Sequence, residues 1–218
     1  MVHLILTGAT GLIGSGVLQQ MLASDAITRI SILSRQPVKM TEGHEDKVRV
    51  IICKDFKNYD QALLDELEDA QGCVWALGVS QNAVDKAKYF EITHDYPLDA
   101  AKAFSTLHPS SPFTFDFVSD EGATQDPGIL TAMFGRVKGQ TEKDHKEIHP
   151  FIPAQPWWKK PLIAPIDTVY QKLMTPTKPL GRILTELAMS KGEPLQGKDI
   201  QMEGTVMPNT AFRRVAGL

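Results

Sequence analysis

The chain has 218 residues, of which 42% are hydrophobic and 22% charged, and its formal net charge is −3. This composition suits a globular protein with room for one α/β domain, and it provides no basic field that would favour nucleic acid or an anionic membrane as a partner. No apolar run approaches the ~20 residues that span a bilayer, so we expect no membrane segment. The two cysteines, Cys53 and Cys73, have the character of small buried apolar residues, and we expect a cytoplasmic protein.

Residues 2–6 form an apolar run that predicts a short buried strand, and residues 17–22 predict a helix with an apolar face. Between them lies the sequence TGATGLIG, which has three glycines at a spacing of three. Glycine lets the backbone turn tightly and approach a ligand closely, and the start of the following helix offers unpaired N–H groups. We therefore predict a dinucleotide site here, with a plain strand–helix turn as the alternative. The expected binding residues are Gly8, Thr10, Gly11, Leu12, Ile13 and Gly14.

A second strand is predicted over 27–33 and is followed by Ser34 and Arg35. In a dinucleotide-binding βαβ unit, the adenosine ribose is recognised at the end of this strand. An acidic residue there would bond the ribose 2′-OH, whereas Arg35 offers a planar cation suited to a 2′-phosphate. We therefore expect the cofactor to be NADP(H); a solvated arginine at a strand end is the alternative.

The next two predicted strands, 48–53 and 73–78, also end in candidate binding residues. Asp55 follows the first and either bonds the adenine amino group or caps the next helix. The second ends in small residues, so we expect Leu77 and Gly78 to let the diphosphate and the nicotinamide ribose lie close to the backbone.

The rest of the chain continues the alternation of strands and helices. The remaining expected elements are a helix over 88–107 bent near Pro97, a strand over 113–118, a helix over 130–148, a strand over 151–154, helices over 166–174 and 180–190, and a strand over 199–203. This alternation predicts an α/β fold, a doubly wound, mostly parallel Rossmann sheet flanked by helices. We expect a single domain over 1–218, with a dinucleotide-binding core over 1–150 and a small substrate-facing lobe over 151–218.

Ser119, Asp120 and Glu121 come just after the fifth predicted strand. In open α/β sheets the chemistry is placed at this end of the strands, so Asp120 and Glu121 are candidate acid/base residues, with a solvated acidic turn as the alternative. Trp157 and Trp158 either stack on an aromatic substrate or pack the C-terminal part.

Four stretches make the chain resemble the atypical short-chain dehydrogenase/reductases: the glycine loop, Ser34-Arg35, FVSDEGA at 117–123 and FGRVKGQTE at 134–142. Within that family the chain is similar to the small NADPH-binding group that includes the Tat-interacting oxidoreductase. The resemblance implies an NAD(P)-binding oxidoreductase that passes a hydride between NADP(H) and a small carbonyl compound or alcohol. We expect an apolar or aromatic small-molecule substrate and no nucleic-acid or membrane partner. A homodimer is one oligomeric state that the resemblance allows.

In that family a Tyr-x-x-x-Lys pair on the helix after the fifth strand supplies the proton, because the lysine makes the phenol a usable acid near neutral pH. Lys138 occupies the lysine position, but Phe134 stands four residues earlier, and none of the four tyrosines has a lysine four residues after it. Phe134 has no proton to give and cannot take the role of the tyrosine. We expect its side chain to lie in the substrate pocket. The proton then comes from Asp120, Glu121 or water. Either Ser119 serves as the family's serine or Asp120 has replaced it.

Lys138 is still expected to bond the nicotinamide ribose, so cofactor binding is better supported than catalysis. The expected catalytic residues are Ser119, Asp120, Glu121 and Lys138. An NADPH-dependent reductase is favoured. There are two alternatives. One is an isomerase, dehydratase or cyclase on the same scaffold, and the other is a non-catalytic NADP-binding regulator. We expect no metal ion, since His145 and His149 are four residues apart but lack a third ligand.

Overall fold

The computed structural model of the chain describes residues 2–107, 112–119, 123, 126, 131, 133–148, 176–198, 200, 204 and 207–217. The strands are β1 Val2–Thr7, β2 Ile27–Ser34, β3 Val48–Ile52, β4 Gly72–Trp75 and β5 Thr114–Phe117. The α-helices are α1 Leu12–Ala23, α2 Gln61–Leu67, α3 Lys86–Phe90, α4 Tyr96–Phe104, α5 Met133–Ile148, α7 Thr177–Ala188 and α8 Asn209–Ala216. A short 3₁₀ helix, η1, spans Lys39–Thr41, and a π-helical turn, η2, spans Glu91–Asp95.

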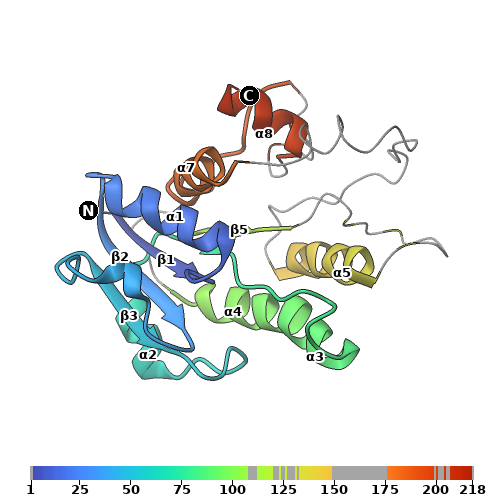
Figure 1. Cartoon of the computed structure of the whole chain (residues 1–218), viewed down its shortest axis with the longest axis horizontal. Helices are drawn as coiled ribbons and strands as arrows, with labels where there is room; N and C mark the ends of the chain where they lie inside the picture. The colour runs from blue at the N-terminus through green and yellow to red at the C-terminus, as the bar shows by residue number, and fades with distance from the viewer. Residues whose placement is uncertain are drawn as a thin grey trace.

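The five strands form one parallel sheet in the order β3-β2-β1-β4-β5. The order reverses between β1 and β4, as in the doubly wound dinucleotide-binding fold, and helices cover both faces (Figure 1). The predicted fold class is therefore confirmed.

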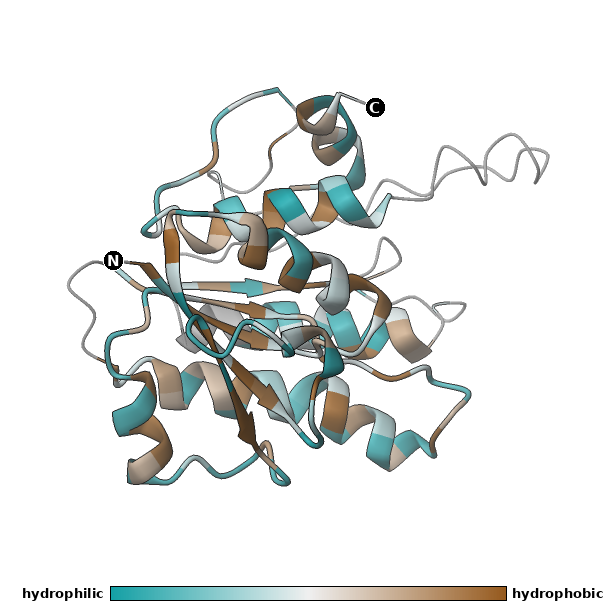
Figure 2. Ribbon diagram, turned by 60° about the vertical axis from the view of Figure 1, so that its left-hand side comes forward, coloured by the Kyte–Doolittle hydropathy of each residue, from teal (hydrophilic) through white to brown (hydrophobic). Residues whose placement is uncertain are grey.

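The core forms two layers because alternate strand residues face opposite sides of the sheet. Leu4 and Leu6 pack with Val17 of α1 in one cluster. Ile5 packs with Phe104 of α4 in the other. Burial on both faces explains why the strands are almost continuously hydrophobic, as the brown ribbons in Figure 2 show.

Helix α7 lies against α1 on the same face of the sheet (Figure 1). The two backbones nearly touch: a Cβ added at Gly181 would lie 2.4 Å from the Gly16 carbonyl oxygen. Only a residue without a side chain allows this approach. This helix belongs to the expected C-terminal lobe, and it covers the sheet. The expected elements at 151–154 and 166–174, and most of 199–203, lie outside the described residues.

The helix expected over 88–107 is not one uninterrupted α-helix, although the chain stays helical from Lys86 to Phe104. The chain instead runs through α3, the π turn η2 and α4. Pro97 lies in the first turn of α4, directly after the π turn, and because proline has no N–H it cannot donate a helical hydrogen bond to a carbonyl of that turn. The fourth strand is also shorter than expected, ending at Trp75, because residues 76–79 leave the sheet and line a cavity. Among the described helices, none is long and apolar enough to cross a membrane.

Candidate functional site

The glycine loop joins β1 to α1 by direct backbone packing. Gly8 has a φ of +68°, and a Cβ there would lie 2.3 Å from the Ala76 carbonyl oxygen. A Cβ at Gly14 would lie 2.1 Å from the Gly8 carbonyl oxygen. The Gly11 N–H donates to Gly8 O at 2.8 Å and closes the turn. Side chains are therefore sterically excluded at Gly8 and Gly14.

Gly11 is also the N-cap of α1 and provides no side-chain cap for the first turn. The N–H groups of a first helical turn have no partner within the helix, and the dipole favours an anion there. Apart from its chain neighbours, the one atom of the described residues within 4 Å of a Cβ at Gly11 would be the Gly8 carbonyl oxygen, at 3.3 Å, so the space beyond it is open in the part of the chain that the structure describes. These features fit the pyrophosphate of a dinucleotide.

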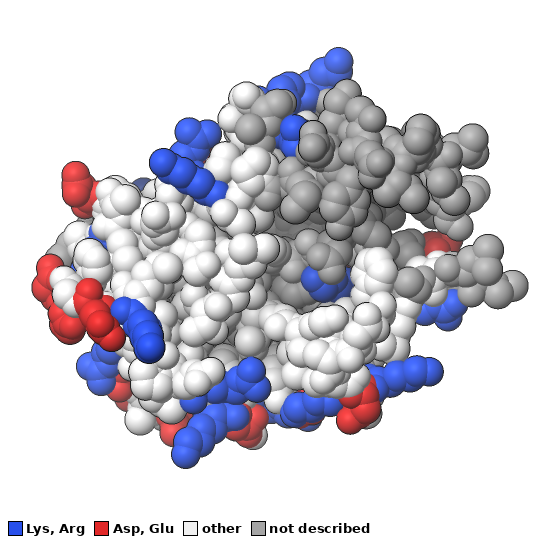
Figure 3. Space-filling model, viewed as in Figure 1, with Lys and Arg blue, Asp and Glu red and all other residues white. Residues whose placement is uncertain are grey.

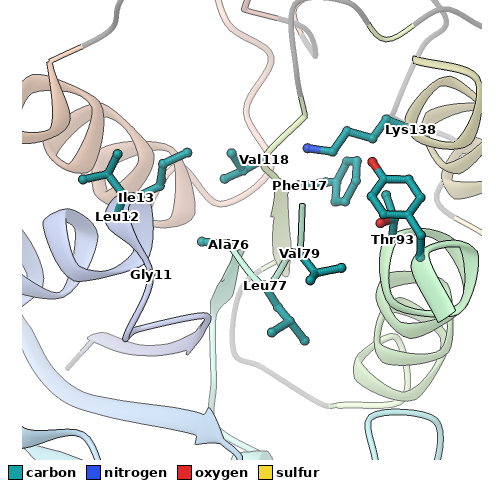
Figure 4. Close-up of a pocket in the computed structure, with 12 residues that line it drawn as sticks. Gly11, Leu12, Ile13, Ala76, Leu77, Val79, Thr93, Phe117, Val118 and Lys138 are labelled. Carbon is teal, nitrogen blue, oxygen red and sulfur yellow. The ribbon is translucent and has the colours of Figure 1, made fainter. Parts of the chain in front are cut away.

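A cavity of about 290 Å³ lies beside this loop, at the carboxyl ends of β1, β4 and β5. The Leu77 N–H donates to the buried Thr7 hydroxyl at 3.3 Å and fixes its floor. In Figure 4, Leu12 and Ile13 lie on one side and Lys138 and Thr93 on the other, with the Lys138 amine toward the cavity. The lining residues are Gly11, Leu12, Ile13, Ala76, Leu77, Gly78, Val79, Tyr89, Thr93, Phe117, Val118 and Lys138.

Helix α5, which carries Lys138, is attached to the π turn by polar contacts. The buried Thr141 hydroxyl lies 3.0 Å from the Thr93 carbonyl oxygen. The His94 Nε2 lies 2.8 Å from Asp144 Oδ2. Although burial raises the pKa of Asp144, hydrogen bonds from Gln140 and His94 bring it below its ordinary value. These contacts fix the position of α5, and α5 places Lys138 at the cavity, across from the glycine loop.

Ser119 donates a hydrogen bond from Oγ to Glu142 Oε1. Glu142 lies one helical turn after Lys138, so both point to the same side of α5. The sequence analysis did not select Glu142, although this glutamate is the last residue of the FGRVKGQTE stretch. Its position four residues after Lys138 was the available signal.

Arg35 and Asp55 are both exposed, just past the ends of β2 and β3. The Asp55 carboxylate accepts hydrogen bonds from Asn58 Nδ2 at 2.6 Å and from the Lys57 N–H at 2.9 Å, and these bonds lower its pKa. Asp60, not Asp55, caps α2 by accepting from the Leu63 N–H at 2.8 Å. The helix-cap interpretation of Asp55 is therefore wrong, and its contact with adenine stays a prediction.

The structure brings the glycine loop, Leu77, Gly78 and Lys138 to one cavity. Phe134 lies one turn before Lys138 on α5, where its N–H donates to Gln81 Oε1 at 3.2 Å, and it is not among the lining residues. The expected residues Asp120, Glu121, Trp157 and Trp158 lie outside the described part of the chain.

Lining residues that the sequence analysis missed are Val79, Tyr89, Thr93, Phe117 and Val118. The spacing of four between Tyr89 and Thr93 was a weak signal for a shared face. Among the described residues, no group of three His, Cys, Asp or Glu side chains gathers for a metal. In Figure 3, most charged side chains lie along the margins of the described surface, and a basic side chain is also visible near the centre of this face.

The strand order, the glycine turn and the cavity at the point of reversal define a Rossmann-type dinucleotide fold. No protein-family model matches the chain. The crystal structure of the KRED1-Pglu enzyme shares this fold with a TM-score of 0.61 and 16% identity, covering 87% of this chain and 95% of that one. Other solved structures of the same fold include short-chain dehydrogenase/reductases.

The curated proteins that are similar in sequence include two biosynthesis cluster proteins. The leucinostatins biosynthesis cluster protein T of Purpureocillium lilacinum is 43% identical over 148 residues, which are 67% of this chain and 52% of that protein. The chain thus spans about half the length of this relative. The botcinic acid biosynthesis cluster B protein 16 of Botryotinia fuckeliana is 32% identical over 155 residues, covering 56% of this chain and 98% of that protein. The chain belongs to the same family as this second protein.

Proposed function

We propose that the protein binds NADP(H) and reduces a small carbonyl compound, as a short-chain dehydrogenase/reductase whose proton donor is not residue 134. The observation that carries this proposal is the meeting of the glycine loop and Lys138 at one cavity. A loop suited to a pyrophosphate and a cation near the reacting end are the two parts that hydride transfer from a dinucleotide requires.

In this proposal, different residues of the chain bind different parts of the cofactor. The first turn of α1 takes the diphosphate, and the Lys138 ammonium takes the ribose hydroxyls next to the nicotinamide. Arg35 is exposed past the end of β2 and takes the 2′-phosphate, which supports NADP(H) over NAD. When bound, NADPH supplies the hydride.

The substrate is apolar or aromatic in this proposal, because Leu77, Val79, Phe117 and Val118 line the cavity. The two relatives described above are biosynthesis cluster proteins. We therefore propose that the substrate is an intermediate of a small-molecule biosynthetic route. The likeness to the Tat-interacting oxidoreductase group supports the same cofactor.

A second candidate function is a non-redox isomerase, dehydratase or cyclase. The contact between Ser119 and Glu142 favours it, since that contact supplies a carboxylate on the same helix as Lys138. A positioned carboxylate can move a proton without any hydride.

The test is to measure binding of NADPH and NADH to the purified chain by fluorescence, and then NADPH oxidation with a panel of apolar and aromatic ketones and aldehydes. The proposal expects tighter binding of NADPH and oxidation with at least one carbonyl. Absence of binding to both nucleotides overturns it. Turnover of a substrate by nucleotide-free protein selects the non-redox function instead.

A further inference from the structure

The cavity beside the glycine loop is lined mostly by glycine and apolar side chains, with few polar ones. Nine of its twelve residues are glycine or have apolar side chains, and the three polar side chains are Tyr89, Thr93 and Lys138. Of these, Thr93 has an alcohol that does not act as an acid near neutral pH. Tyr89 has the phenol, and Lys138 has the cation that favours an ionised phenol.

Tyr89 is placed at the cavity by local structure. Asp85 caps α3 by accepting from the Lys88 N–H at 2.9 Å, and the Tyr89 N–H donates to Asp85 O at 2.9 Å. The residue as a whole is 2% exposed, so its phenol faces the interior and the cavity rather than bulk water.

The π turn connects Tyr89 to the helix that carries Lys138. Thr93 comes four residues after Tyr89 and lines the same cavity. The Thr93 carbonyl oxygen accepts a hydrogen bond from the Thr141 hydroxyl of α5 at 3.0 Å. Single π turns inside helices occur frequently at functional sites. A phenol and an ammonium therefore line one cavity from two separate elements, without a Tyr-x-x-x-Lys sequence.

We propose that Tyr89 gives the proton to the substrate oxygen, in the role that Phe134 cannot perform. This inference rests on the proposed function. The carbonyl carbon gains a hydride from NADPH, which becomes NADP⁺. The carbonyl π electrons move to the oxygen, which takes the phenolic proton of Tyr89, and water reprotonates the phenolate. The product is the alcohol.

The first test compares Tyr89→Phe with Tyr96→Phe in the full chain. Tyr96 is the matched control, because its hydroxyl lies 3.2 Å from Lys88 Nζ and it is not among the cavity-lining residues. Loss of a general acid lowers kcat by about 10²-fold or more. We expect that loss in Tyr89→Phe alone, with the Kd for NADPH unchanged in both variants. A wild-type kcat in Tyr89→Phe overturns the proposal for Tyr89 and leaves the reductase function standing.

The second test needs neither cofactor nor turnover. The ultraviolet tyrosinate titration of the wild type, minus that of Tyr89→Phe, isolates the ionisation of Tyr89. In a Lys138→Met background the same difference is expected to move to higher pH, because the cation that favours the phenolate is gone. An unchanged titration shows that the two groups do not interact, and it overturns the proposal. Failure of the wild type to bind NADPH is instead a failure of the proposed function.

Discussion

Replacing Thr141 by valine tests how α5 is held at the cavity. Thr141 is fully buried, and its Oγ1 lies 2.9 Å from Val137 O in its own helix and 3.0 Å from Thr93 O in the π turn. A hydroxyl has one proton, so the two carbonyls share it. Valine has almost the same shape, so the change removes the hydrogen bonds with little change in packing.

Thr185→Val is the matched control. Thr185 is 3% exposed, and its hydroxyl donates to Gly181 O within α7 at 2.7 Å. Both substitutions remove an intrahelical bond, but Thr141→Val also leaves the buried Thr93 carbonyl without this donor. A hydrogen bond contributes about 0.5–1.5 kcal/mol, so Thr141→Val should cost about 1 kcal/mol more than the control. For a chain of 218 residues this is a further fall in Tm of about 2–4 °C.

Urea unfolding of both variants, followed by circular dichroism, measures the two free energies. We expect unchanged m-values, and a lower kcat/KM in Thr141→Val because Lys138 lies one turn earlier on the same helix. Equal free-energy losses in the two variants would refute the view that this hydroxyl attaches α5 to the π turn.

Three further substitutions test other parts of the molecule. Arg35→Ser should weaken NADPH binding about tenfold or more and leave NADH binding unchanged, because a charge-assisted bond is lost; Arg49→Ser, which removes an exposed arginine paired with Glu66 at 2.9 Å, should change neither Kd. Burial lowers the pKa of His3 and outweighs the hydrogen bond that the Asp69 carboxylate accepts from its Nδ1, so the stabilisation from neutral His3 should fall as pH drops below about 6.5; His3→Gln should flatten that part of the Tm–pH curve, and an identical slope would contradict this. Burial raises the pKa of Asp116, whose Oδ2 has no hydrogen-bond partner in the described part of the chain; stability should fall as pH rises above about 4, and Asp116→Asn should show a Tm advantage at pH 7 that disappears near pH 4.

Much of the fold could be predicted from the sequence because its signals are local. The strands are mostly apolar, with Asp116 of β5 as an exception, and the glycine spacing marks the turn between β1 and α1. The contact of Gly16 with Gly181 could not be foreseen, since it joins positions far apart in the chain and a glycine inside a helix is not evidence for its partner.

The site was predicted unevenly for the same reason. Leu77, Gly78 and Lys138 follow from their place after a strand or within a motif, and the structure brings them to the cavity. Tyr89 was missed because its place at the cavity depends on how α3 and the π turn pack together and against α5, and no local sequence pattern encodes that packing. The bond from Ser119 to Glu142 depends on how α5 meets β5, which no local pattern encodes.

The most direct test of a dinucleotide at the glycine loop is isothermal titration calorimetry with NADPH on the wild type and on Gly11→Ala. A Cβ at Gly11 would lie 3.3 Å from the Gly8 carbonyl oxygen, so this backbone oxygen must shift slightly in the variant, and the Tm is measured with the Kd to show that the variant is folded. That Cβ would occupy space beside the cavity that the diphosphate needs. We predict micromolar binding by the wild type and a Kd at least about tenfold higher in Gly11→Ala. Equal Kd values in the two proteins, or no heat of binding in the wild type, would contradict the account.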